Sequence, residues 1–186
     1  MKMRLDIDRL MRNRRLFLIS LIILFVQSPI FAQPQVTARN GIVTSSSQDA
    51  SDIGIRILQQ GGNAVDAAVA VGYALAVTHP SAGNIGGGGF MLLRLNDGTT
   101  TSIDYREKAP LKASKTMYQD DEGNVMTQLS RVGAMASGVP GTVAGLSLAL
   151  DTYGTMPLAQ VMQPAIALAR DGFRVSERLA RSLNSR

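Results

Sequence analysis

Residues 67–77 (AAVAVGYALAV) constrain the fold of this chain more than any other stretch. If they form a helix, apolar side chains surround nearly its whole circumference, and such a helix is buried on most sides. Its many small residues allow close packing against a sheet. Asn63 is well placed to cap this helix, and Asp66 lies in the first turn, where negative charge is favourable. We therefore interpret Asp66 as a capping residue and not as a catalytic acid.

The elements around this helix predict a mixed α and β chain. A preceding helix ends at Gly61-Gly62, since glycine commonly follows a helix end. Asn96-Asp97-Gly98 predicts a tight turn between two strands, and Pro164 is expected to divide or kink a later helix. The expected strands cover residues 41–46, 90–95 and 99–106, the other helices cover 51–60, 139–150, 156–170 and 174–186, and a polar surface turn covers 119–124. The pattern is that of the opening of a larger fold.

Four successive glycines, residues 86–89, follow the apolar helix and precede a strand. A phosphate-binding loop has the reverse order, because its glycines follow a strand and lead into a helix N-terminus. No Lys-Ser or Lys-Thr pair follows Gly89 either. Turn amides forming an anion-binding nest remain an alternative. We favour another interpretation, in which the glycines let a buried strand begin close to another backbone or to a reacting group.

The basic residues of the chain are concentrated at its start. The formal net charge is +5, and residues 1–32 hold six basic residues against two acidic ones. A nucleic-acid-binding protein shows a basic patch with aromatic residues nearby, and residues 33–186 show neither. Arg12, Arg14 and Arg15 lead into 11 uncharged residues, 16–26, and then to Ala32, as in a secretory signal peptide. We expect cleavage after Ala32, a periplasmic or secreted product and no stable membrane insertion, with a retained membrane anchor as the alternative.

The chain has no cysteine and one histidine, His79. Disulfides, thiol chemistry and zinc sites built on cysteine are therefore excluded, and so is a metal site rich in histidine. We expect neither a metal nor a cofactor.

Five motifs in order resemble the N-terminal part of the γ-glutamyltransferases. They are residues 61–68 (GGNAVDAA), 78–80 (THP), 83–91 (GNIGGGGFM), 104–110 (DYREKAP) and 137–145 (SGVPGTVAG). The resemblance implies an α+β fold of the N-terminal-nucleophile hydrolase type, a four-layer αββα sandwich of which only the N-terminal portion is present. Residues 33–186 would then form the N-terminal part of the large subunit of a precursor that cuts itself into two subunits.

The same resemblance implies a reaction whose nucleophile lies outside this chain. A threonine at the start of the small subunit, beyond residue 186, would attack the γ-glutamyl amide of glutathione or another γ-glutamyl compound, using its own amine as base. No catalytic residue is therefore expected in this chain, and residues 33–186 alone should be inactive. The expected partners are the γ-glutamyl substrate and the small subunit, and no nucleic acid.

One residue, Arg106, receives a role from the resemblance: binding the α-carboxylate of the γ-glutamyl group. Its position at the end of a strand agrees with this role, since a guanidinium group suits a carboxylate. The alternative is a structural ion pair with Asp104 or Glu107. Two other functions also stay open, namely a cephalosporin or glutaryl acylase, which shares the fold, and a non-catalytic binding or structural module.

Overall fold

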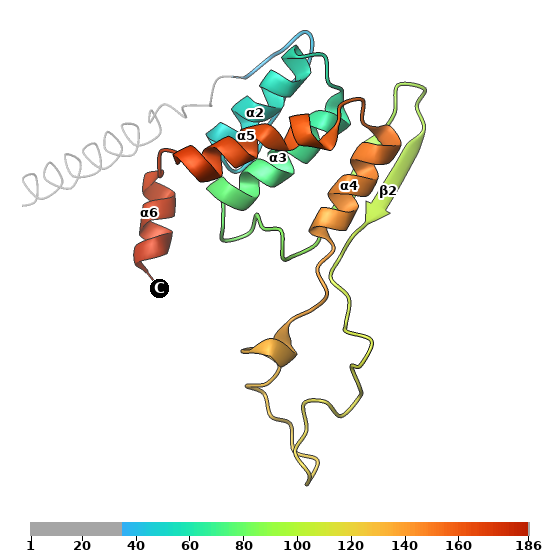
Figure 1. Cartoon of the computed structure of the whole chain (residues 1–186), viewed down its shortest axis with the longest axis vertical. Coiled ribbons are helices and arrows are strands. Elements are labelled where there is room, and N and C mark those ends of the chain that lie inside the picture. Colours follow the sequence, from blue (N-terminus) through green and yellow to red (C-terminus); the bar gives the residue numbers. More distant parts are fainter. Residues whose placement is uncertain (1–34, 186) are drawn as a thin grey trace, which may run out of the picture. The chain divides into compact units, whose positions relative to one another are not determined.

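The computed structural model describes residues 35–185, so the expected signal peptide lies outside the described residues (Figure 1). Its contacts divide the chain into Met1–Thr37 and Ala38–Arg186, and every described element belongs to the second unit. The elements are α2 (Gln48–Gln59), α3 (Ala64–Thr78), β1 (Phe90–Arg94), β2 (Thr100–Asp104), the short 3-10 helix η1 (Ala134–Ala136), α4 (Thr142–Tyr153), α5 (Leu158–Asp171) and α6 (Glu177–Asn184).

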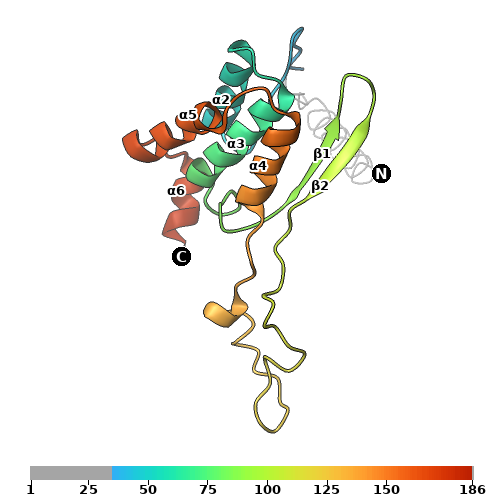
Figure 2. The same cartoon turned by 45° about the vertical axis from the view of Figure 1, so that its right-hand side comes forward.

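Helix α3 is the centre of the core, as its sequence predicts. Its neighbours are the three helices α2, α4 and α5 (Figure 2). Its buried side chains are Val65, Asp66, Ala67, Val69, Ala70, Val71, Tyr73, Ala74 and Thr78. The sequence predicts that the small residues of α3 allow close packing against a sheet, but among the described residues its main neighbours are helices. Its small residues instead admit other helices, and a Cβ on Gly54 of α2 would lie only 2.8 Å from Cγ2 of Val71.

The predicted cap of α3 is confirmed in detail. Asn63 Oδ1 accepts hydrogen bonds from the backbone N–H groups of Val65 (2.8 Å) and Asp66 (3.0 Å), and Asp66 Oδ2 accepts one from Asn63 N–H (2.7 Å). Asp66 also accepts the N–H groups of Thr155 (2.9 Å) and Met156 (3.1 Å) and the hydroxyl of Thr155 (2.6 Å). One buried carboxylate thus joins the start of α3 to the connection between α4 and α5.

Strands β1 and β2 form the predicted antiparallel hairpin, in which Phe90 pairs with Asp104 and Arg94 with Thr100. Alternate side chains point to opposite faces of a strand. On one face Met91, Leu93 and Ile103 pack against the core. On the other face Phe90 is 63% exposed and Leu92 84% exposed. The expectation of a buried strand after the glycines is therefore correct for only one face of β1.

Two further expectations differ from the structure. Residues 41–46 form no strand, because Val43 packs against Gly54 of α2 instead of pairing with a neighbouring strand. Of the two effects expected of Pro164, division of the helix does not occur, since α5 continues through Pro164 as one helix, while a kink stays a prediction. Proline removes one backbone hydrogen bond there, while the buried residues Val161 and Ala165 keep both sides of the proline against the core.

Residues 107–140 leave the end of β2, run away from the helices and return to the start of α4 (Figure 2). Two isolated bridges, Lys108 with Val139 and Gln119 with Val125, hold this segment together. The predicted surface turn is confirmed, since Asp120 Oδ1 accepts the N–H groups of Glu122 and Asn124. Within residues 35–185, no helix combines the length and the apolar character needed to cross a membrane.

Candidate functional site

Arg106 lies two residues beyond the end of β2 and is exposed. It lines a cleft of about 250 Å³ between this end of the hairpin and the start of α4. The remaining lining residues are Ile103, Asp104, Tyr105, Lys108, Val139, Pro140, Gly141, Ala144, Gly145 and Leu148. Arg106 thus stands just beyond a strand end, close to where the sequence predicts it, and a cleft lies there.

The guanidinium group of Arg106 has no carboxylate partner among the described residues. The ion pairs of residues 35–185 join Arg170 to Asp171 (2.7 Å) and Arg181 to Glu177 (3.6 Å). The pair with Asp104 or Glu107 that the sequence left open does not form. The Asp104 side chain instead contacts the backbone of Arg106, since Asp104 Oδ1 accepts the Arg106 backbone N–H at 3.0 Å. Arg106 therefore lines the cleft as an exposed residue with no ion pair among the described residues.

The glycine run connects the two walls of the cleft. The carbonyl oxygen of Gly87 accepts the N–H groups of Gly141 (2.8 Å) and Thr142 (3.0 Å) at the start of α4. Gly89 and Tyr105 exchange hydrogen bonds in both directions, at 3.0 and 3.4 Å. The interpretation that the glycines allow close approach to another backbone is confirmed.

The start of α4 adds a second favourable feature for an anion. Its N-cap residue is Gly141, and no side chain caps the helix, although the Gly87 carbonyl already accepts the N–H groups of Gly141 and Thr142. No acidic residue lies in its first turn. The N-terminus of a helix carries a partial positive charge. Arg106 and Lys108 line the same cleft, against one carboxylate, that of Asp104. The cleft therefore suits a small carboxylate ligand.

The cleft is lined by charged, aromatic and apolar side chains and by glycine. Among the described residues that line it, there is no serine, threonine, histidine or cysteine. Burial raises the pKa of Tyr105, so its phenol stays neutral at physiological pH. No three His, Cys, Asp or Glu side chains within residues 35–185 gather as a metal site would require.

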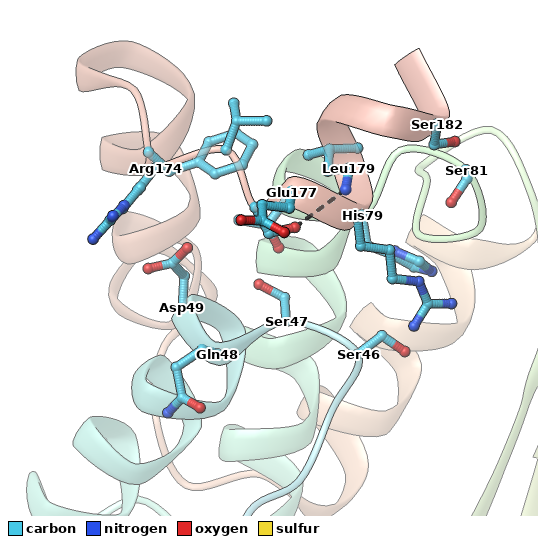
Figure 3. Close-up of a pocket in the computed structure, with 15 residues that line it drawn as sticks. Ser46, Ser47, Gln48, Asp49, His79, Ser81, Arg174, Glu177, Leu179 and Ser182 are labelled. Carbon is cyan, nitrogen blue, oxygen red and sulfur yellow. Dashed lines mark hydrogen bonds between the residues drawn. The ribbon is translucent and has the colours of Figure 1, made fainter. Parts of the chain in front are cut away.

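A second cavity, of about 570 Å³, lies between the start of α2, the end of α3 and α6 (Figure 3). Asp49 and Glu177 contribute negative charge to its walls, and Arg174 and Arg178 positive charge. The hydrogen bond drawn there joins the Leu179 N–H to Ser176 Oγ and caps α6 (Figure 3). The two acidic and two basic side chains give its walls no net excess of charge.

Sequence reasoning missed the contribution of α4 to the cleft. Residues 137–145 were part of the family resemblance, yet they received no role. The signal was available, because three glycines in nine residues are unusual at a helix start. What could not be read from the sequence is that Gly141 and Gly145 face Tyr105.

The sequence matches the family model described as Gamma-glutamyltranspeptidase over residues 50–186. The chain belongs to the γ-glutamyltranspeptidase family. It is similar to the glutathione hydrolase proenzyme of Escherichia coli (strain K12), with 61% identity over 150 residues. That match covers 81% of this chain and 26% of the relative. The chain thus spans about a quarter of the length of this curated relative.

Solved structures show the same relationship to the γ-glutamyltranspeptidase family. The crystal structure of Helicobacter pylori γ-glutamyltranspeptidase matches with a TM-score of 0.78 and 52% identity, over 82% of this chain and 44% of that chain. Cephalosporin acylase from Bacillus halodurans matches with a TM-score of 0.72 and 30% identity, over 86% of this chain and 30% of that chain. The predicted α+β class and the relationship to N-terminal-nucleophile hydrolases are confirmed.

Proposed function

We propose that this chain is part of a γ-glutamyltransferase that also hydrolyses glutathione. The family membership and the names of the relatives support the reaction. Because the chain spans about a quarter of the curated relative, the activity belongs to the complete protein. In that protein a threonine hydroxyl beyond residue 186 would attack the γ-glutamyl amide. The amine would leave, and water or an amino acid would then take the γ-glutamyl group.

The part assigned to this chain is the recognition of the donor. The observation that carries the proposal is that Arg106 lines an anion-suited cleft and has no carboxylate partner among the described residues. A γ-glutamyl group carries an α-carboxylate, and guanidinium binds a carboxylate through two parallel hydrogen bonds. Arg106 would hold that carboxylate, and the start of α4 would add its partial positive charge.

The test replaces Arg106 in the complete protein and compares two substrates, a γ-glutamyl amide and its analogue without the α-carboxylate. Truncating one partner of a buried charge pair costs about 2–5 kcal/mol. For Arg106→Ala we therefore expect kcat/KM for the γ-glutamyl amide to fall roughly 30-fold to several thousand-fold, at about 1.4 kcal/mol per decade. Arg106→Lys should recover only part of this loss, because an ammonium group lacks the planar pair of donors.

Arg94→Ala is the matched control, because Arg94 is an exposed arginine at the opposite end of the same hairpin. Arg94→Ala should leave kcat/KM for both substrates at the parent values. Self-cleavage and the melting temperature of Arg106→Ala should also stay near the parent values. Equal losses on the two substrates would show that Arg106 does not bind the α-carboxylate.

A second candidate reaction is acyl-amide cleavage of the cephalosporin acylase type. The structural match to the Bacillus halodurans enzyme favours it. The two reactions differ in their donors, because a γ-glutamyl donor carries an α-amino acid end. The α-carboxylate of that end suits a cationic cleft. A panel of γ-glutamyl, glutaryl and cephalosporin amides, offered to the complete protein, separates them. A non-catalytic module would be indicated if the coding sequence contained no threonine-started strand downstream of residue 186.

A further inference from the structure

Gly88 lies unusually close to the backbone that carries Arg106. A Cβ atom on Gly88 would stand 2.5 Å from the carbonyl oxygen of Tyr105, 2.7 Å from the nitrogen of Glu107 and 2.8 Å from Cα of Arg106. All three atoms belong to the backbone, which cannot turn aside as the end of a side chain can. Any residue other than glycine at position 88 would therefore displace the backbone of residues 105–107, which includes Arg106.

Tyr105 holds the same segment from the other side. Its backbone is tied to Gly89 by the two hydrogen bonds described above. Its ring packs against the core and lies over Gly145 of α4, where a Cβ would overlap Cβ and Cγ of the tyrosine. A Cβ on Gly89 would come within 3.0 Å of the opposite part of the ring. The residue before Arg106 thus lies between the glycine run and α4.

We propose that Gly88 and Tyr105 are positioning residues for Arg106, and that Gly88 belongs to the donor site for this reason. This proposal rests on the proposed function, because the position of Arg106 matters to the reaction only if Arg106 binds the donor. Gly88 sets the distance between the glycine run and the Arg106 Cα. Tyr105 prevents the end of β2 from rotating or shifting along α4.

An ordinary packing role makes a different prediction. If Gly88 only helped the hairpin to fold, its replacement would lower the amount or the stability of the protein and would affect every substrate alike. If Gly88 instead positions Arg106, its replacement should weaken only the binding of donors that carry the α-carboxylate. The ratio of kcat/KM for the γ-glutamyl amide to kcat/KM for the analogue without the α-carboxylate separates the two roles.

The experiment measures this ratio in the complete protein for Gly88→Ala, Gly86→Ala, Tyr105→Leu and Arg106→Ala. Gly86 is the matched control, since a Cβ added to it meets no atom within 4 Å. A displacement of about 1 Å at a binding group costs up to about 100-fold in rate. We therefore expect the ratio to fall by about 10- to 100-fold for Gly88→Ala, mainly through KM of the γ-glutamyl amide, and to keep its parent value for Gly86→Ala.

Each outcome supports or overturns the proposal. A parent ratio for folded Gly88→Ala, or equal losses on both substrates, overturns it. If Gly88→Ala yields no folded protein, Tyr105→Leu decides the question, because it loosens the same segment without a backbone clash; a parent ratio in that variant overturns the proposal too. If Arg106→Ala itself affects both substrates equally, the proposed function fails. If only Arg106→Ala is selective, the positioning role alone fails.

Discussion

At the scale of single residues, Asp66 makes a pH-dependent contribution to stability. Burial alone would raise its pKa, but hydrogen bonds from the Thr155 side chain and from the N–H groups of Asn63, Thr155 and Met156 lower the pKa below its ordinary value. A group with a lowered folded-state pKa stabilises the protein above its unfolded pKa, which is about 3.9 for aspartate. That stability is lost as pH falls through the folded-state pKa.

We predict that the melting temperature of the complete protein falls as pH drops below about 4, and that Asp66→Asn reduces this dependence. The asparagine side chain would also place its NH2 group where the carboxylate accepted hydrogen bonds from N–H and O–H donors. Each buried donor left without a partner lowers the free energy of unfolding by about 1–3 kcal/mol. Thermal melts between pH 3 and pH 7 measure both effects. Asp52→Asn, on the exposed side of α2, is the control and should melt like the parent. A parent-like melting curve for Asp66→Asn would contradict the role given to this carboxylate.

At the scale of elements, the hairpin β1–β2 has no further strand beside it among the described residues. Two strands alone form a sheet that is marginally stable at best. Phe90 and Leu92 leave one of its faces apolar and exposed, and exposed apolar patches mark interaction surfaces or aggregation sites. We predict that residues 33–186 produced alone show no γ-glutamyl release and no cooperative thermal transition. A sharp two-state melt, or γ-glutamyl release above background, would refute this prediction.

At the scale of the whole molecule, the charge distribution predicts export. Residues 1–32 carry +4 of the net charge of +5. All of their charged residues precede an apolar run, 16–26, that is shorter than the roughly 20 residues of a membrane span. We predict a periplasmic or secreted product whose N-terminal sequence begins at Gln33. Recovery of a membrane-bound product that retains Met1 would show that the leader is a retained anchor instead.

Local interactions explain which elements could be predicted. The α3 cap, the hairpin turn and the stop at Gly61-Gly62 depend on residues close in sequence, so short patterns were sufficient. In the turn, Asp97 Oδ1 accepts the Thr99 N–H at 2.8 Å, and Gly98 adopts a positive φ of 87°. The errors involve distant partners. Residues 41–46 have the composition of a strand, but Gly54 of α2 gives Val43 a packing site that competes with strand pairing.

The sequence by itself determined that a helix over residues 64–78 would be buried, that a hairpin would follow the glycine run, and that Arg106 would stand at a strand end. Each of these follows from periodicity, capping or turn chemistry within a few residues. Only the tertiary structure decided that helices cover α3, that Asp66 reaches Thr155, 89 residues away, and that α4 forms the second wall of the Arg106 cleft. These contacts join segments far apart in the chain, and they depend on which backbones come close enough to touch. Glycine permits such an approach, but it does not specify the partner.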